Sequence, residues 1–143
     1  MVATKKATAV WKGGIKDGGG AISTETGVLK DAAYGFKSRF ETGPGTNPEE
    51  LIAAAHAGCF SMALTLMLGN EGLTPERIET QAAVTIEKVG EGFEITTSEL
   101  TVTAKIPGAD QAKFMEIANK AKAGCPVSKV LKAKITMNAK LEN

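Results

Sequence analysis

Two cysteines, Cys59 and Cys125, are the residues of this 143-residue chain with the clearest capacity for covalent chemistry. They are the only cysteines, and no Cys-x-x-Cys spacing is present. With a single histidine, His56, the chain lacks the ligands of a structural zinc site. In a reducing compartment such a pair is more often catalytic or a redox switch than a permanent crosslink. Because only the thiolate is a nucleophile, the surroundings of each sulfur decide its role.

Those surroundings favour Cys125 over Cys59 on electrostatic grounds. Cys125 precedes Pro126 at the expected start of a short helix, with Lys129 four residues on, and both features favour a thiolate. Cys59 lies in a charge-free segment, where burial raises the pKa and the helix dipole adds little. A nearby cation would be needed to ionise Cys59, and Arg39 is a candidate. Cys59 acting only as a small buried hydrophobe is the alternative.

Arg39 and Glu49 are the charged residues that could complete a site. Alternation over Tyr34–Phe40 predicts a strand with its aromatic face on one side and Arg39 on the other. Arg39 is then either a solvated surface residue or part of a site made with a partner chain. Glu49 precedes Cys59 by ten residues, which is about 15 Å along a helix. It would approach Cys59 only of a second, antiparallel copy, or it simply stabilises the helix N-terminus.

His56 lies three residues before Cys59, so the two side chains share a helix face. A Cys–His pair can serve acyl transfer as nucleophile and base. No orienting residue or oxyanion-binding group can be named beside it. A partly buried, hydrogen-bonded histidine is the alternative.

The element that must position Cys59 is a helix predicted from Thr46 to Leu68. Thr46 or Asn47 can cap it, and Pro48 suits its first turn. From residue 51 to residue 68 there is no charge, so the helix is apolar nearly all round. Such a helix is buried on every side or spans a membrane, and its many small and polar residues favour burial.

The remaining pattern predicts an α+β fold in one domain over residues 1–143. Strands are expected at residues 6–12, 21–25, 79–89, 93–106 and 133–141, with helices at 110–124 and 125–131. A change of apolar parity predicts a bulge near Thr97 or Ser98. Seventeen basic and sixteen acidic residues give no attraction to nucleic acid or anionic lipid. Residues 1–14 lack a signal-peptide core, so the expected compartment is the cytoplasm, with no membrane association.

Three segments of the chain closely resemble the OsmC branch of the OsmC/Ohr family of thiol peroxidases. They are NPEELIAAAHAGCFSMAL at 47–64, GCPVS at 124–128 and YGFKSRF at 34–40. The resemblance covers essentially the whole chain. It implies an OsmC-like fold, with antiparallel sheets around a long buried central helix, in an intertwined homodimer with active sites at the interface.

The resemblance also implies roles that differ from the electrostatic preference. Cys59 would be the peroxidatic thiol, forming a sulfenic acid that condenses with the resolving Cys125 to a disulfide. Arg39 would hold the thiolate and the peroxide, and Glu49 would orient Arg39. No cofactor or metal is implied, because an external dithiol, such as a lipoylated protein, would reopen the disulfide.

The substrate implied is an organic hydroperoxide, reduced to an alcohol in oxidative or osmotic stress, with hydrogen peroxide a poorer substrate. Phe36, Phe40, Phe60 and Met62 are candidates to line an apolar pocket for it. Two other functions remain open at this point. One is a non-catalytic protein that binds a small apolar ligand, with the cysteines as a redox lock. The other is an acyl hydrolase using Cys59 and His56.

Overall fold

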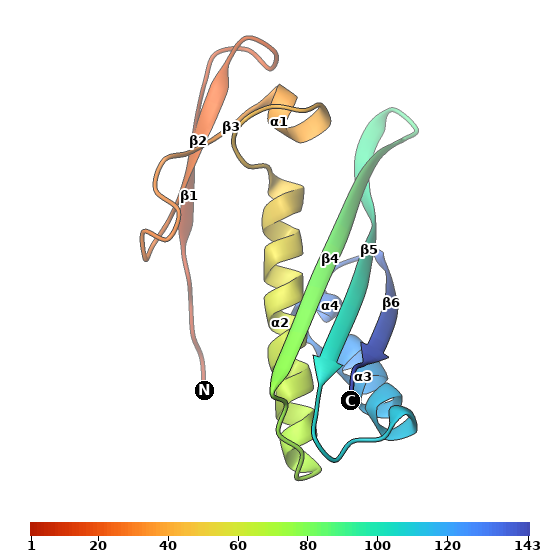
Figure 1. Ribbon diagram of the computed structural model, residues 1–143. Coiled ribbons are helices and arrows are strands. Elements are labelled where there is room, and N and C mark those ends of the chain that lie inside the picture. The colour runs from red at the N-terminus through yellow and green to blue at the C-terminus, as the bar shows by residue number, and fades with distance from the viewer. The chain divides into compact units, whose positions relative to one another are not determined.

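The computed structural model describes residues 1–143, which form two compact units, residues 1–51 and 52–143 (Figure 1). The single domain expected over 1–143 remains a prediction. Each unit contains a three-stranded sheet, and the long helix α2 (Pro48–Asn70) begins in the first unit and continues in the second. The α+β class predicted from the sequence is confirmed.

The N-terminal unit is an antiparallel sheet of β1 (Ala7–Lys12), β2 (Gly19–Thr24) and β3 (Ala32–Tyr34), followed by the short helix α1 (Phe36–Phe40). Gly20 of β2 pairs with Trp11 on one side and Tyr34 on the other. The two rings meet edge to face across it, with centroids 5.5 Å apart. A Cβ at residue 20 would collide with the Tyr34 ring, so glycine is what allows this contact.

The strand predicted over Tyr34–Phe40 is wrong, because most of it is helix α1. Ser38 Oγ accepts a hydrogen bond from the Gly35 N–H at 2.9 Å and donates to the Gly35 carbonyl at 3.1 Å, which closes a helical turn. Phe36 and Phe40 then lie four residues apart on one helix face, with ring centroids 5.2 Å apart. Alternating aromatic residues fit a strand and a helical turn equally well over so short a segment.

Helix α2 begins where its capping residues predict. Asn47 Oδ1 accepts a hydrogen bond from the Glu50 N–H at 2.7 Å, as an N-cap does. The helix ends at Asn70, and Gly72 follows with a positive φ of 74°.

The C-terminal unit is a sheet of order β4-β5-β6, comprising β4 (Arg77–Val89), β5 (Gly92–Lys105) and β6 (Lys134–Leu141). The predicted bulge is confirmed at a neighbouring residue, because Thr85 pairs with Thr97 and Ile86 with Ile95, which leaves Thr96 unpaired. One strand pair departs from the antiparallel sheets that the resemblance implies, because β6 runs parallel to β5. Two helices, α3 (Gln111–Gly124) and α4 (Pro126–Val130), lie between these strands in sequence, and a crossover of that length returns the chain in the same direction.

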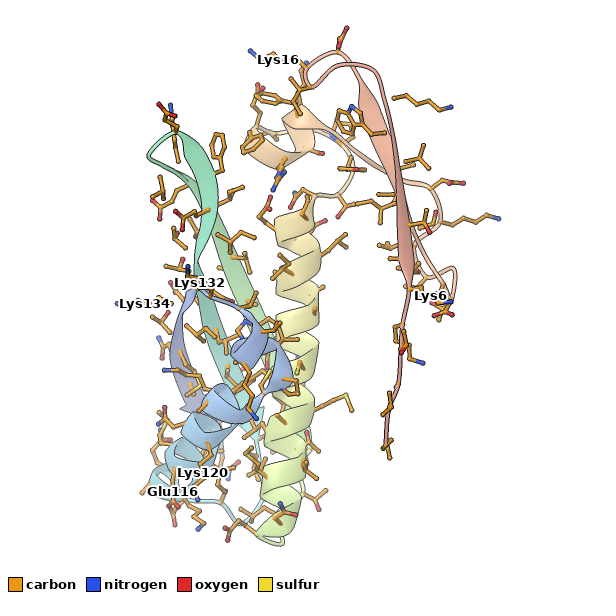
Figure 2. All side chains as sticks on the ribbon, turned by 180° about the vertical axis from the view of Figure 1, so that it is seen from behind. Lys6, Lys16, Glu116, Lys120, Lys132 and Lys134 are labelled. Carbon is orange, nitrogen blue, oxygen red and sulfur yellow. The ribbon has the colours of Figure 1, made fainter.

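The core of this unit is formed by one face of α2, one face of β5 and one face of α3. Its fully buried side chains include Phe60, Leu64, Leu68, Leu100, Val102, Phe114 and Ala121. The outer face of α3 is polar, with Glu116 and Lys120 paired at 3.3 Å (Figure 2). By length and composition α2 would also pass as a membrane span, but its buried face belongs to this core.

A single chain buries only one face of α2, whereas the resemblance implies that this helix is buried within a homodimer. Met62 is 77% exposed and Leu66 is 67% exposed, although Phe60 and Leu64 on the opposite face are fully buried. One chain supplies a sheet and two helices to cover a single face of α2. The apolar residues outside that face therefore remain at the surface.

Candidate active site

Cys59 and Cys125 come together in the C-terminal unit as a pair of free thiols. Cys59 lies on α2. Cys125 is the single residue between α3 and α4, where it is the C-cap of α3 and the N-cap of α4. The Cys125 N–H donates to Ala121 at 2.9 Å, and its carbonyl accepts from Lys129 at 3.1 Å. Each thiol shifts the pKa of the other, so the two side chains are neighbours. Both thiols are free, and a disulfide between them remains a prediction.

The end of α3 lies close to α2 at Gly124. A Cβ at this position would lie 3.2 Å from Met67 Cε of α2. A larger side chain would press directly on Met67. Gly124 therefore helps to place the following residue, Cys125, beside α2.

The two thiols differ in acidity in the sense that the sequence predicts. Burial raises the pKa of Cys59, and its hydrogen bond with Cys125 and the nearby charge of that residue raise it further, against a Val127 N–H that lowers it. Burial also acts to raise the pKa of Cys125, but hydrogen bonds from Cys59, from the Ser128 N–H and hydroxyl, and from Val127 lower it overall. Within this unit Cys125 is the more acidic thiol.

Cys59, the less acidic thiol, is the one that is more accessible to solvent. Cys125 has no exposed surface, whereas Cys59 is partly exposed. Cys59 lines an apolar cavity of about 520 Å³ together with Met62, Ala63, Leu66, Met67, Gly124 and Pro126. Of the predicted lining residues, Met62 is confirmed and Phe60 is wrong, since Phe60 lies fully buried in the core. Phe36 and Phe40 lie on α1 in the N-terminal unit.

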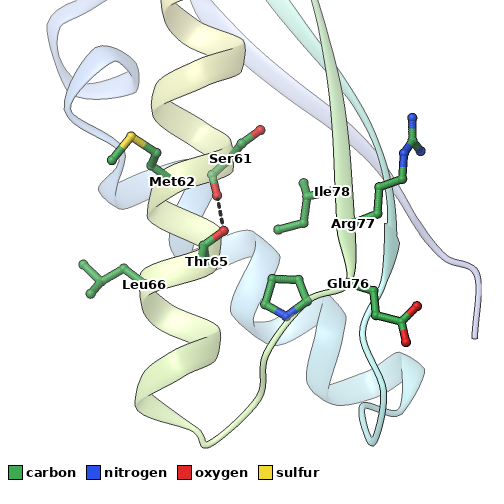
Figure 3. A pocket seen from close by; sticks show the side chains of 8 residues that line it. Ser61, Met62, Thr65, Leu66, Glu76, Arg77 and Ile78 are labelled. Atoms are coloured by element: carbon green, nitrogen blue, oxygen red, sulfur yellow. Dashed lines mark hydrogen bonds between the residues drawn. The ribbon is translucent and has the colours of Figure 1, made fainter.

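A second hollow, of about 550 Å³, lies between α2 and the start of β4 (Figure 3). Its lining includes Ser61, Met62, Thr65, Leu66 and Ile78, without a cysteine or histidine. Met62 and Leu66 line both hollows. This hollow lacks a nucleophile, so the cavity beside Cys59 is the candidate reaction site.

Arg39 and Glu49 form a two-pronged ion pair within the N-terminal unit. Arg39 Nε donates to Glu49 Oε1 and its Nη2 to Glu49 Oε2, each at 3.0 Å. Glu49 is buried, and Asn47 Nδ2 donates to the Ser38 carbonyl at 2.8 Å, which ties α1 to the start of α2. A paired guanidinium of this kind is held in one orientation. The contact between Arg39 and Glu49 is thus observed, and their roles toward Cys59 remain predictions.

His56 is fully buried and hydrogen-bonded at both ring nitrogens. Its Nδ1 lies 2.6 Å from Ser98 Oγ of β5, and its Nε2 lies 2.8 Å from Ser128 Oγ of α4. Burial lowers the pKa of His56, so the ring is neutral at pH 7. The hydrogen-bonded alternative is confirmed, and no ring nitrogen is left to act as a base for Cys59.

Sequence reasoning missed Ser98 and Ser128, although each carries a signal. Ser98 shares a strand face with Leu100 and Val102, and a hydroxyl on a core face needs a partner. Ser128 falls within the segment GCPVS, three residues after a cysteine. Their common partner is the one histidine of the chain.

Comparison with known proteins agrees with this fold. Residues 41–140 match the OsmC-like protein family. The sequence is 55% identical to Peroxiredoxin OsmC of Escherichia coli strain K12 over 143 residues, 100% of each chain. It is 30% identical to the organic hydroperoxide resistance protein OhrB of Bacillus subtilis over 124 residues, 86% of this chain and 89% of the relative.

Among solved structures, an organic hydroperoxide resistance protein from Elizabethkingia anophelis is similar with a TM-score of 0.74 and 27% identity. The match covers 100% of this chain and 98% of that one. The α+β fold is thus the OsmC-like fold. The chain belongs to the OsmC-like family, and it is a peroxidase with an antioxidant role. This membership sets aside the non-catalytic binding protein and the acyl hydrolase.

Proposed function

We propose that this peroxidase reduces organic hydroperoxides to alcohols, with Cys59 as the peroxidatic thiol and Cys125 as the resolving thiol. The observation that carries the assignment is the difference in access. Cys59 lines an apolar cavity, and Cys125 has no exposed surface. A peroxide arriving from solution meets the sulfur of Cys59 first, whichever thiol is the more acidic.

The chemistry balances in two steps. The Cys59 thiolate attacks the distal oxygen of the peroxide, the O–O bond breaks, and the alkoxide takes a proton to leave as an alcohol. The sulfur of Cys125 then attacks the resulting sulfenic acid, forming the disulfide and releasing water. An external dithiol, with lipoylated proteins as the candidate class, reopens the disulfide by exchange, so no bound cofactor takes part.

The cavity supports an organic rather than an aqueous peroxide. Its lining offers the side chains of Met62, Leu66 and Met67 and only a thiol as a polar group. An alkyl or aryl group gains from leaving water for such a surface, whereas hydrogen peroxide does not. The names of the Bacillus and Elizabethkingia proteins, which refer to organic hydroperoxide resistance, agree with this substrate class.

Arg39 and Glu49 are proposed to supply the cation that Cys59 lacks within its own unit. A guanidinium beside the sulfur would lower the pKa of Cys59 and bind the peroxide oxygen. Ten residues of helix separate Glu49 from Cys59, so the pair is proposed to come from a second copy of the chain. The exposed apolar face of α2 supports a homodimer, since Met62, Leu66 and the open side of Gly58 have no cover in one chain.

We assign the enzyme to the cytoplasm.

The test is single-turnover kinetics with cumene hydroperoxide and with hydrogen peroxide, on reduced wild type, Cys59→Ser and Cys125→Ser. We expect Cys59→Ser to lose peroxide reduction and Cys125→Ser to keep one fast turnover that ends as a trappable sulfenic acid. Cumene hydroperoxide should react faster than hydrogen peroxide. The opposite pattern in the two variants would make Cys125 the peroxidatic thiol and refute the assignment.

A further inference from the structure

The buried polar groups behind Cys125 form a continuous chain across three elements. It runs from Ser98 on β5 through His56 on α2 to Ser128 on α4, with separations of 2.6 and 2.8 Å. Ser128 follows Cys125 by three residues, and its hydroxyl acts to lower the pKa of the Cys125 thiol. Ser98 and His56 are fully buried, and Ser128 is 7% exposed. No charged side chain takes part in these bonds. This series of hydrogen-bonded side chains, called here the serine–histidine relay, ends beside the thiol of Cys125.

The tautomer of a neutral histidine sets the direction of such a relay. A neutral ring donates from one nitrogen and accepts at the other, whereas each serine hydroxyl can do both. If Nε2 carries the proton, it donates to Ser128 Oγ, and the Ser128 O–H then points at the sulfur of Cys125. If Nδ1 carries the proton, the Ser128 O–H is used on Nε2 and only its lone pairs face the sulfur.

Resting on the proposed function, we propose that Ser128 and His56 are positioning residues for the resolving step. In this arrangement Ser98 donates to His56 Nδ1, His56 Nε2–H donates to Ser128, and Ser128 donates to the sulfur of Cys125. Hydrogen bonds aligned in one direction reinforce one another and stabilise a thiolate at their end. Burial disfavours that thiolate, and the relay opposes this effect without placing a charge on the buried ring.

The step that the relay assists is closure of the disulfide. The Cys125 thiol releases its proton, the thiolate sulfur bonds to the sulfur of Cys59, the S–O bond of the Cys59 sulfenic acid breaks, and the departing hydroxide takes up that proton to form water. His56 remains neutral throughout, so no further oxidant, reductant or base is required. The oxygen-transfer step at Cys59, which precedes closure, does not depend on the relay.

The first measurement is the tautomer of His56 in the reduced wild-type protein by ¹⁵N NMR. The chain has one histidine, so the ring gives a single, unambiguous pair of nitrogen signals. We expect the proton on Nε2 at pH 7. A proton on Nδ1 would overturn the proposal.

The second measurement is the rate of each half-reaction in Ser128→Ala, Ser128→Thr and His56→Gln. Loss of one hydrogen bond to a sulfur anion should slow disulfide closure about tenfold in Ser128→Ala, with sulfenic acid formation at Cys59 changed less than twofold. Ser128→Thr keeps the hydroxyl and should restore closure. Thr101→Ala removes an exposed hydroxyl from the same strand as Ser98 and serves as the matched control. Unchanged closure in Ser128→Ala would refute the relay.

A third measurement separates failure of the relay from failure of the proposed function. In Cys59→Ser the titratable neighbour that hydrogen-bonds Cys125 is gone, so the pH dependence of alkylation reports the Cys125 thiol alone. Adding Ser128→Ala should raise the apparent pKa of Cys125, and adding Ser128→Thr should not. This result decides the relay even if wild type fails to turn over peroxide, and an apparent pKa unchanged by Ser128→Ala would contradict it.

Discussion

The two thiols of this chain divide access and acidity between them. Cys59 meets the cavity but has its pKa raised, whereas Cys125 has its pKa lowered but is sealed from solution. For two cysteines that act in sequence this division is useful. In the proposed cycle, the accessible sulfur of Cys59 is oxidised once a cation lowers its pKa, and the buried sulfur of Cys125 is protected from peroxide until it attacks the sulfenic acid.

Burial of His56 predicts a pH-dependent stability. Its pKa is lowered in the folded state by burial, so the unfolded chain binds a proton more readily. The stabilising contribution is therefore complete above the unfolded pKa near 6.5 and is lost as the pH falls toward the folded pKa. Urea denaturation should show the free energy of unfolding falling below pH 6.5, by at most about 1.4 kcal/mol per pH unit from this group.

His56→Gln provides the comparison, because glutamine does not titrate and can still donate and accept a hydrogen bond. The variant should be less stable than wild type at pH 7.5, with a flatter dependence between pH 6.5 and pH 5. Parallel curves for the two proteins would show that the histidine is not the source of the effect.

At the scale of elements, the N-terminal sheet depends on the absence of a side chain at residue 20. Gly20→Ala would push a methyl group into the Tyr34 and Trp11 rings, and overpacking of this kind costs about 1–3 kcal/mol. The neighbouring Gly19→Ala is the matched control, because its nearest contact would be an ordinary 3.9 Å. Trp11 is the only tryptophan, so its fluorescence on urea unfolding reports this sheet directly. Equal midpoints for the two variants would contradict this packing.

Some helices and strands can be predicted from the sequence, and others cannot. Asn47, Pro48 and the charge-free segment after Glu50 predict α2 correctly, because caps and long apolar runs are local signals. The short helix α1 was missed, because its aromatic spacing fits two periods and the Ser38 bonds decide between them. The parallel pairing of β6 depends on where α3 and α4 return the chain, which strand alternation cannot reveal.

Some residues of the candidate site were likewise predicted from the sequence, and others were not. The family resemblance predicts that Glu49 orients Arg39, and the two side chains do pair in the structure. The pKa of Cys125 is lowered, as electrostatic reasoning favours, but the causes are hydrogen bonds from Cys59, Ser128 and Val127. Ser98 and Ser128 were not predicted as partners of His56, because they lie 42 and 72 residues from it in the sequence. A partner at that distance is set by the fold.

At the scale of the whole molecule, the exposed side of α2 leads to a prediction about assembly. Ala54, Ala55, Gly58, Met62 and Leu66 are exposed on a helix with no charge between residues 51 and 68. Small residues allow close helix packing, and the apolar area left in water favours a second copy as the cover. If the copies pack antiparallel, each Glu49 and its Arg39 would approach the Cys59 of the other chain.

Mixed dimers test this arrangement. Cys59→Ser and Arg39→Ala homodimers should each be nearly inactive, because one lacks the attacking sulfur and the other lacks the cation that ionises it. A dimer with one chain of each kind, purified with two different tags, contains one complete site only if Arg39 acts across the interface. We expect that dimer to recover about half of the wild-type rate of cumene hydroperoxide reduction per dimer, since one of its two sites is intact. A mixed dimer of two Arg39→Ala chains with the same tags controls for tagging, and recovery no greater than in that control would place Arg39 and Cys59 of one site in the same chain.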